Sequence, residues 1–175
     1  MLEPMTPHWT IEVRRGPQPR DEGRRVWECY REVFSDAEDF DGWLAGMFDR
    51  HARREGHRLV VASVDDEIIG FAWGYVGEFG QYWTDLAASA LPEPVSAAWL
   101  GGHFEFVELG VRPKLRGAGV GRALHDALLD GVDRRALLST ADDDADPAVQ
   151  LYLRSGWRRL GALSTGVQVM GRMPH

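Results

Sequence analysis

The chain has 175 residues, of which 44% are hydrophobic and 27% charged, a composition typical of a globular protein. This length predicts a single domain over residues 1–175 with a substantial core. The formal net charge of −7 disfavours a nucleic-acid partner, for which a basic surface is expected.

Neither a membrane span nor a secretory signal is indicated. The sequence has no apolar run of roughly eighteen residues, and its first residues lack a basic start followed by an apolar segment. Cys29 is the only cysteine, which excludes an internal disulfide framework and a cysteine-rich zinc site. We therefore expect a cytoplasmic protein with no membrane partner, in which Cys29 has a packing role.

The first half of the chain predicts a strand, two helices, a hairpin and an irregular segment. Residues 10–13 are strand-like, and apolar residues recur at helical spacing over 24–34 and 40–48. The segments RLVVASV and IIGFAWGYV flank three acidic residues, which is typical of a hairpin. Residues 77–102 combine aromatic, acidic and small residues with two prolines, and predict a loop with one or two short helices.

The second half alternates strands and helices. It begins with a strand, HFEFVELGV, and ends with two strand-like pieces around 161–164 and 168–170. Between them we expect a helix over 120–129, a buried strand RALLST, and a helix that Asp146-Pro147 opens and Gly156 stops.

A glycine-rich turn, RGAGVG, leads into the helix over 120–129. Glycines let backbone N–H groups approach a ligand closely, and a helix N-terminus favours phosphate oxygens. A dinucleotide fingerprint fails because Arg122 stands where the third glycine is required, and a triphosphate loop fails because Gly121 is followed by Arg122 and Ala123. The alternative is a tight turn whose glycines only permit chain reversal.

The turn resembles the acyl-CoA motif of the GCN5-related N-acetyltransferase (GNAT) superfamily, Val-x-Pro-x-x-Arg-Gly-x-Gly-x-Gly. The matching residues are Val111, Pro113, Arg116, Gly117, Gly119 and Gly121. A second segment, DPAVQLYLRSGW, resembles the family's Asn-x-x-Ala-x-x-Leu-Tyr-x-x-x-Gly-Phe segment. Its matches are Ala148, Leu151, Tyr152 and Gly156, with Trp157 at the aromatic position. Ala145 or Asp146 stands where the family often has asparagine, which puts a side-chain contact to the cofactor there in doubt.

The resemblance covers most of the chain and implies an α/β fold. Its features are a mixed, mostly antiparallel sheet of about six or seven strands, helices on both faces, and a cofactor cleft between splayed central strands. It implies acetyl-CoA as co-substrate, without a metal. The pantetheine arm would pair with Leu109, Gly110 and Val111, with the Val111 amide polarising the thioester carbonyl. The pyrophosphate would lie on the turn formed by Arg116, Gly117, Ala118, Gly119, Val120, Gly121 and Arg122.

The resemblance also implies catalytic groups. Tyr152 would protonate the departing thiolate, whereas the alternative is a tyrosine packed at helical spacing. Glu105 and Glu108 are candidate bases, and because they lie three apart on a strand at most one should reach the acceptor. Glu105 matches an acidic position of the family. A water chain, or glutamates without any catalytic duty, are the alternatives.

The acceptor is expected to bind against the irregular segment. Its lining would comprise Glu78, Phe79, Tyr82, Trp83, Asp85 and Trp99, of which Glu78, Tyr82, Trp83 and Trp99 are the candidates we select. Aromatic and acidic side chains suit an ammonium group. The equal alternative is a surface insertion covered by its own aromatics. The acidic segment ADDDADP is interpreted as a solvated loop with a helix N-cap, and His103 and His125 as structural or exposed.

These features predict an acetyl-CoA-dependent N-acetyltransferase that transfers the acetyl group directly to an amine of a small molecule or peptide. The alternative is a non-catalytic acyl-CoA-binding module that senses the cofactor, which would keep the turn but would not need Tyr152 or Glu105. An acyl group longer than acetyl is also open, and a homodimer is common in the family.

Overall fold

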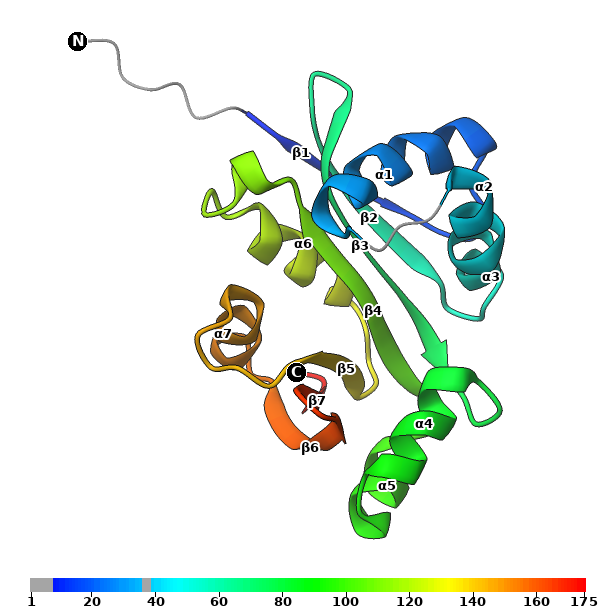
Figure 1. The fold of residues 1–175 in the computed structure, drawn as a ribbon, viewed down its shortest axis with the longest axis vertical. Helices are drawn as coiled ribbons and strands as arrows, with labels where there is room; N and C mark the ends of the chain where they lie inside the picture. Colours follow the sequence, from blue (N-terminus) through cyan, green and yellow to red (C-terminus); the bar gives the residue numbers. More distant parts are fainter. Residues whose placement is uncertain (1–7, 36–38) are drawn as a thin grey trace, which may run out of the picture. The chain divides into compact units, whose positions relative to one another are not determined.

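The computed structural model describes residues 8–35 and 39–175. The chain forms two compact units, one of residues 1–73 and 108–130 and the other of residues 74–107 and 131–175. The divisions fall within two long strands, β3 (Glu67–Gly77) and β4 (His103–Val111), which are labelled in Figure 1. The strands form a seven-stranded sheet in the order β1 (Thr10–Arg14), β2 (Arg58–Val64), β3, β4, β5 (Ala136–Ala141), β7 (Val167–Arg172) and β6 (Arg158–Ser164).

The first unit holds β1 (Thr10–Arg14) and β2 (Arg58–Val64), which pair antiparallel. Its first helical region consists of α1 (Arg20–Val33), α2 (Phe40–Trp43), the π-helix η1 (Leu44–Phe48) and α3 (Asp49–Ala52). The 3-10 helix η2 (Pro113–Leu115) and α6 (Val120–Leu129) follow β4.

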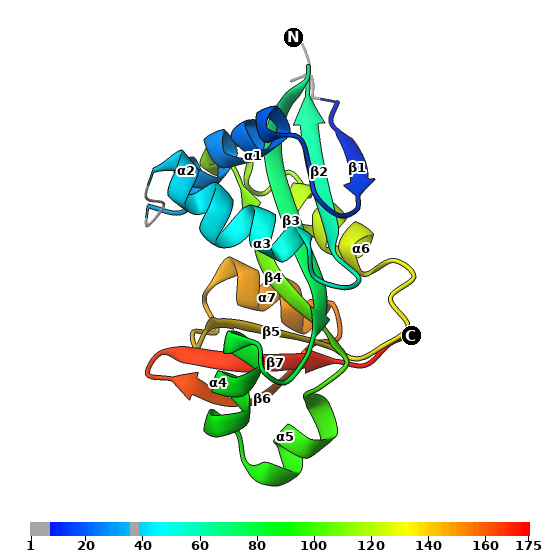
Figure 2. The same ribbon diagram turned by 90° about the vertical axis from the view of Figure 1, so that its right-hand side faces the viewer.

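Helices cover both faces of the sheet in this unit (Figure 2). On one face, the Tyr30 ring of α1 lies 5.7 Å from Phe71 and 6.3 Å from Trp73. Residues at even positions of β3 face the other way. A Cβ added at Gly70 would lie 2.9 Å from the Leu124 side chain of α6. Gly70 therefore allows α6 to pack directly on the sheet.

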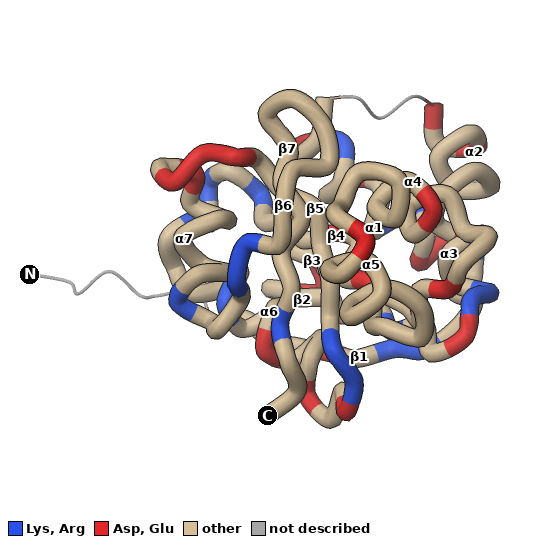
Figure 3. The backbone as a smooth tube through the Cα atoms, turned by 90° about the horizontal axis from the view of Figure 1, so that it is seen from below, with Lys and Arg blue, Asp and Glu red and all other residues tan. Residues whose placement is uncertain are grey.

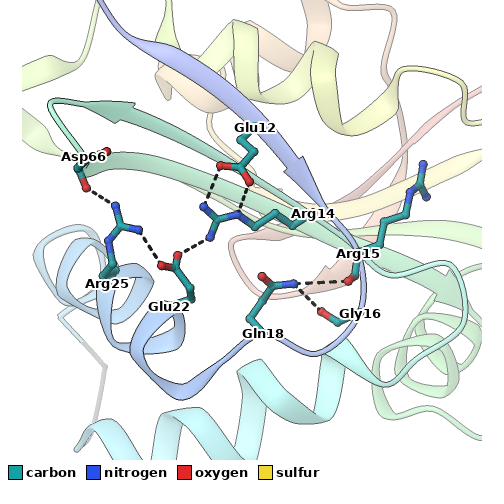
Figure 4. A network of polar contacts seen from close by, with 8 residues as sticks. All are labelled: Glu12, Arg14, Arg15, Gly16, Gln18, Glu22, Arg25 and Asp66. Atoms are coloured by element: carbon teal, nitrogen blue, oxygen red, sulfur yellow. Dashed lines mark hydrogen bonds and ion pairs between the residues drawn. The ribbon is translucent and has the colours of Figure 1, made fainter.

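A network of ion pairs fastens α1 to β1 and to the β2–β3 turn (Figure 4). Arg14 binds both carboxylate oxygens of Glu12 at 2.9 Å and reaches Glu22 of α1. Arg25 donates to Glu22 at 2.8 Å and to the carbonyl of Asp66 in the turn. Both carboxylates sit beside guanidinium groups, which hold the pKa of Glu12 and Glu22 below the ordinary value.

The second unit holds β5 (Ala136–Ala141), β6 (Arg158–Ser164) and β7 (Val167–Arg172). β5 pairs parallel with β4, whereas β7 pairs antiparallel with both β5 and β6. The helices are α4 (Tyr82–Ala90), α5 (Glu93–Trp99) and α7 (Pro147–Arg154). One core cluster joins α4 and α5 to the strands through Ala87, Leu91, Trp99, Leu100, Leu137 and Val169.

The predicted fold class is confirmed. The sheet is mixed and seven-stranded, and each predicted strand and helix is present. The β4–β5 ladder is short, pairing Phe104 with Ala136 and Glu105 with Leu137. The single domain over residues 1–175 stays a prediction.

Candidate functional site

The glycine-rich turn owes its conformation to two glycines. Gly117 and Gly119 have φ of +81° and +85°, a left-handed conformation that residues with a side chain rarely adopt. A Cβ added at either position would meet no atom within 4 Å. The backbone conformation, rather than lack of space, therefore requires glycine here. The space above both glycines is open to a ligand.

The start of α6 presents backbone donors. The N–H of Ala123 is the first to donate a helical hydrogen bond, which the Gly119 carbonyl accepts at 3.1 Å. Among the described residues, 8–35 and 39–175, the N–H groups of residues 117–122 donate no backbone hydrogen bond. The first turn of α6 has no acidic residue and no side-chain cap. These donors and the positive end of the helix favour an anion.

Buried side chains hold the start of this helix. Val120 and Leu124 are 1% and 0% exposed. The turn itself is fixed by Arg112, whose side chain donates to the Ile68 carbonyl at 2.8 Å and pairs with Glu67 at 3.3 Å. The backbone N–H of Arg112 also donates to the Ile69 carbonyl at 2.8 Å. The sequence analysis did not single out Arg112, although it lies inside the turn motif.

The three residues expected to pair with a pantetheine arm are Leu109, Gly110 and Val111, at the end of β4. Gly110 is buried, and a Cβ there would lie 2.6 Å from Cζ of Phe71. Leu109 and Val111 are half-buried. Gly110 thus lets β4 lie close against β3, so the strand that precedes the turn is held firmly.

Glu105 is a buried carboxylate in the second unit. It is 4% exposed, and its Oε1 accepts a hydrogen bond from the Tyr75 hydroxyl at 3.2 Å. Tyr75 is itself only 2% exposed, and sequence reasoning missed it. Glu108 belongs to the first unit and is half-buried. The structure therefore gives the two candidate bases different surroundings.

Tyr152 lies on α7 and is 6% exposed. Its ring meets Phe106 of β4 edge to face at 6.0 Å and lies 5.8 Å from Trp157. Upstream, the Asp146 side chain caps α7 by accepting from the N–H of Ala148 at 2.8 Å. The proposed N-cap is thus present. The acidic residues before α7 form a continuous stretch of the tube (Figure 3).

The structure does not bring the four selected acceptor residues together as one lining. Tyr82 is 80% exposed on α4, and Glu78 is also exposed. Trp83 is half-buried, and its indole N–H donates to Ser139 Oγ at 3.1 Å. Trp99 is a core residue, 5% exposed, with the Arg158 guanidinium 5.0 Å from its ring.

His103, His125 and Cys29 are buried, as is typical of residues with a structural role. His103 is fully buried, Nδ1 accepts from the Gly101 N–H at 3.1 Å, and burial lowers the pKa of the imidazole to about 4. His125 is 1% exposed, with Nδ1 2.8 Å from Asp126. Burial raises the pKa of Cys29 to about 12. The thiolate needed for a reactive cysteine is therefore disfavoured.

The described residues, 8–35 and 39–175, hold neither a metal-binding cluster nor a membrane-spanning helix. In this described part of the chain, no three His, Cys, Asp or Glu side chains are grouped so as to hold a metal ion. No helix there has the length and apolar character needed to cross a membrane.

Comparison with known proteins shows the family of the chain and agrees with its fold. Residues 24–157 match the acetyltransferase (GNAT) family, and the chain belongs to that family. A curated relative, the GCN5-like protein acetyltransferase Rv2170 of Mycobacterium tuberculosis, is 36% identical over 98 residues. That alignment covers 51% of this chain and 48% of the relative, so the chain spans about half the length of this relative.

Solved structures share the fold at low sequence identity. PH1933 from Pyrococcus horikoshii superposes with a TM-score of 0.66 at 17% identity, covering 95% of this chain and 99% of that chain. The PaiA N-acetyltransferase of Thermoplasma acidophilum, solved in complex with coenzyme A, superposes with a TM-score of 0.59 at 11% identity. Coverage there is 94% of this chain and 99% of that chain. At these identities the solved structures show that the chain shares their fold.

Proposed function

We propose that this chain is an acetyl-CoA-dependent N-acetyltransferase that transfers the acetyl group directly to the amine of a small molecule or peptide. The observation that carries the proposal is the turn before α6. There, left-handed Gly117 and Gly119 leave open space beside backbone N–H donors at a helix N-terminus. Because the chain belongs to the GNAT family, we expect the pyrophosphate of acetyl-CoA to occupy this anion site.

The residues of the turn fit a pyrophosphate. The N–H groups of residues 117–122 would donate to its oxygens, and the positive end of α6 would favour its charge. Arg116 is exposed beside the turn and adds a positive charge. Leu109, Gly110 and Val111 would hold the pantetheine arm as an added strand, with the Val111 N–H donating to the thioester carbonyl. The proposed contacts to the pyrophosphate and to the pantetheine arm are made mainly by backbone groups, so few side chains are needed to bind the cofactor.

Two groups are proposed to move protons, one as a base and one as an acid. Glu105 takes the proton that the amine loses on attack, and Tyr152 donates a proton to the sulfur as the carbon–sulfur bond breaks. Each general acid or base of this kind contributes roughly 10²–10⁴-fold to a rate. Glu108 is the second candidate for the base.

The acceptor is proposed to carry a cationic amine that meets Glu78 and Tyr82. Glu78 is exposed in the segment between β3 and α4, and Tyr82 is exposed at the first residue of α4. A carboxylate and a phenol ring can bind an ammonium group. Trp83 and Trp99 contribute by holding this helix, because Trp83 bonds to Ser139 and Trp99 packs with Ala87 and Leu91.

Two further features belong to the same proposal. Cytoplasmic location is supported by the single cysteine, which is buried and has no partner cysteine to form a disulfide within the chain. A homodimer is proposed on the family resemblance.

The proposal is tested by calorimetric titration of the purified protein with acetyl-CoA, with NAD and ATP as controls. One-site saturable binding of acetyl-CoA alone is expected, followed by release of free thiol when a panel of amines is added. Folded protein that binds none of the three would overturn the assignment of the turn. Binding without thiol release from any amine would instead favour the acyl-CoA-binding module. Replacing acetyl-CoA with longer acyl-CoA thioesters measures the acyl preference.

A further inference from the structure

A buried tyrosine and a buried glutamate meet in the second unit. Tyr75 on β3 and Glu105 on β4 are 2% and 4% exposed, and the phenol donates to Oε1 at 3.2 Å. A phenol contributes one donor, and an ionised carboxylate accepts through both oxygens. An ionised Glu105 accepts this hydrogen bond, and it is the ionised form that the proposed general-base role requires.

Neighbouring glycines fix the distance between the two strands at this contact. A Cβ at Gly74 would lie 2.4 Å from the Glu105 carbonyl and 2.6 Å from the Phe104 ring. A Cβ at Gly77 would lie 2.3 Å from Nε2 of His103. β3 and β4 consequently lie close together on both sides of Tyr75, which leaves its ring little freedom to turn away from Glu105.

We propose that Tyr75 is the positioning residue for the general base, holding the Glu105 carboxylate in the orientation in which it accepts the proton of the acceptor amine. The inference rests on the proposed function. In the step, the amine nitrogen bonds to the acetyl carbon and its N–H proton passes to Glu105. The carbon–sulfur bond breaks, and the departing thiolate takes a proton from Tyr152, while Tyr75 keeps its own proton. A hydrogen bond to the ionised form also stabilises that form. Loss of the phenol hydroxyl should therefore raise the pH at which Glu105 becomes active.

The charged and titratable groups near the contact in this unit include His103, Arg135 and Tyr152. His103 lies two residues before Glu105 on the same face of β4, with Nδ1 bonded to Gly101. Arg135, which donates to the carbonyls of Trp99, Leu100 and Gly101, acts electrostatically on His103. Tyr152 lies toward the other face, against Phe106. These groups remain in place in the variants below.

The test is a double-mutant cycle on the acetyl-CoA-dependent reaction, with kcat, KM and their pH dependence measured for each variant. Tyr75→Phe should lower kcat roughly tenfold, leave acetyl-CoA binding unchanged, and move the acidic limb of the kcat/KM profile to higher pH. In a Glu105→Gln background the same substitution should change kcat by less than about twofold, because Tyr75 acts through Glu105. Tyr30→Phe, which removes a hydroxyl from a tyrosine 3% exposed in the other unit, is the matched control.

Three results would overturn the inference. Equal losses from Tyr75→Phe in both backgrounds would show a purely structural role. If Tyr75→Phe leaves kcat and the pH profile unchanged while Glu105→Gln is inactive, the proposed function stands and Tyr75 has no part in it. No turnover by the unmodified protein with any amine would overturn the proposed function as well. If Tyr75→Phe does not fold, Glu105→Asp breaks the contact from the other side by retracting the carboxylate. It should then show the same limb shift, and an unshifted limb would contradict the inference.

Discussion

Glu105 and Phe106 are neighbours on β4 whose side chains lie on opposite faces of the strand. Glu105 accepts from Tyr75, whereas Phe106 meets Tyr152 edge to face at 6.0 Å. Successive side chains of a strand alternate between faces. The proposed base and the proposed acid therefore lie on opposite faces of β4.

This separation makes a prediction for Tyr152→Phe. The ring and its packing against Phe106 and Trp157 are kept while the proton donor is lost, so turnover should fall about 10²-fold with folding intact. The measurement is kcat from free-thiol release, together with calorimetric Kd for acetyl-CoA. Kd should change by less than about twofold, because the proposed contacts to the cofactor are made by backbone groups. Unchanged kcat would assign Tyr152 to packing alone.

A second prediction concerns Gly119→Ala. The residue has φ of +85°, so the substitution strains the backbone by about 1–2 kcal/mol, and the new methyl group occupies the open space above the turn. Acetyl-CoA should bind at least about tenfold more weakly, which calorimetric titration measures.

Gly131→Ala is the matched control for the turn. Gly131 has φ of +70° and no atom within 4 Å of an added Cβ, so its strain is comparable. It lies after α6, outside the proposed cofactor contacts. Both variants should lose similar stability, but only Gly119→Ala should lose affinity. Equal affinities in the two variants would argue that the turn only reverses the chain.

A third prediction concerns the cap of α7. Asp146→Ala removes the oxygen that accepts from Ala148 at 2.8 Å and from Val149 at 3.4 Å. Loss of an N-cap costs about 1 kcal/mol. Thermal denaturation should show a lower Tm. Asp142→Ala removes the same charge but keeps its backbone bond to Gly166 at 2.9 Å, and should be nearly neutral. An equal loss in Asp142→Ala would mean that the acidic segment stabilises the unit through its charge.

Much of the fold could be predicted from the sequence because the spacing of apolar residues and the positions of glycines mark the same element boundaries. α6 has the bounds that the sequence predicts, Val120–Leu129, since its apolar positions and its left-handed glycine cap both mark them. α1 instead begins at Arg20, four residues before the predicted start at Arg24. Its first turn is polar and is held by the bond from Gly23 N–H to the Pro19 carbonyl, which leaves no apolar pattern to detect.

The candidate site was less predictable, because contact and exposure are tertiary properties. Tyr75 lies within an otherwise apolar strand and is indistinguishable in sequence from a core residue, until β4 brings Glu105 against it. Tyr82 and Trp99 are both aromatic residues of the irregular segment, yet one is 80% exposed and the other 5%. Only the packing of α4 and α5 on the sheet separates them. By contrast, the backbone groups of the turn are readable in sequence because glycine marks them directly.

The last prediction concerns acid sensitivity. Burial lowers the pKa of His57 and His103 to about 4 and that of His51 to about 3, from the ordinary value of 6.5. Because the unfolded chain takes up these protons first as pH falls, the free energy of unfolding should fall between about pH 6.5 and pH 4. Each histidine contributes at most about 1.4 kcal/mol per pH unit. Urea denaturation at a series of pH values measures this slope. His103→Asn, which keeps an acceptor for Gly101, should reduce it, whereas His8→Gln at an exposed position should not. An unaltered slope in His103→Asn would show that His103 does not stay neutral in the folded protein.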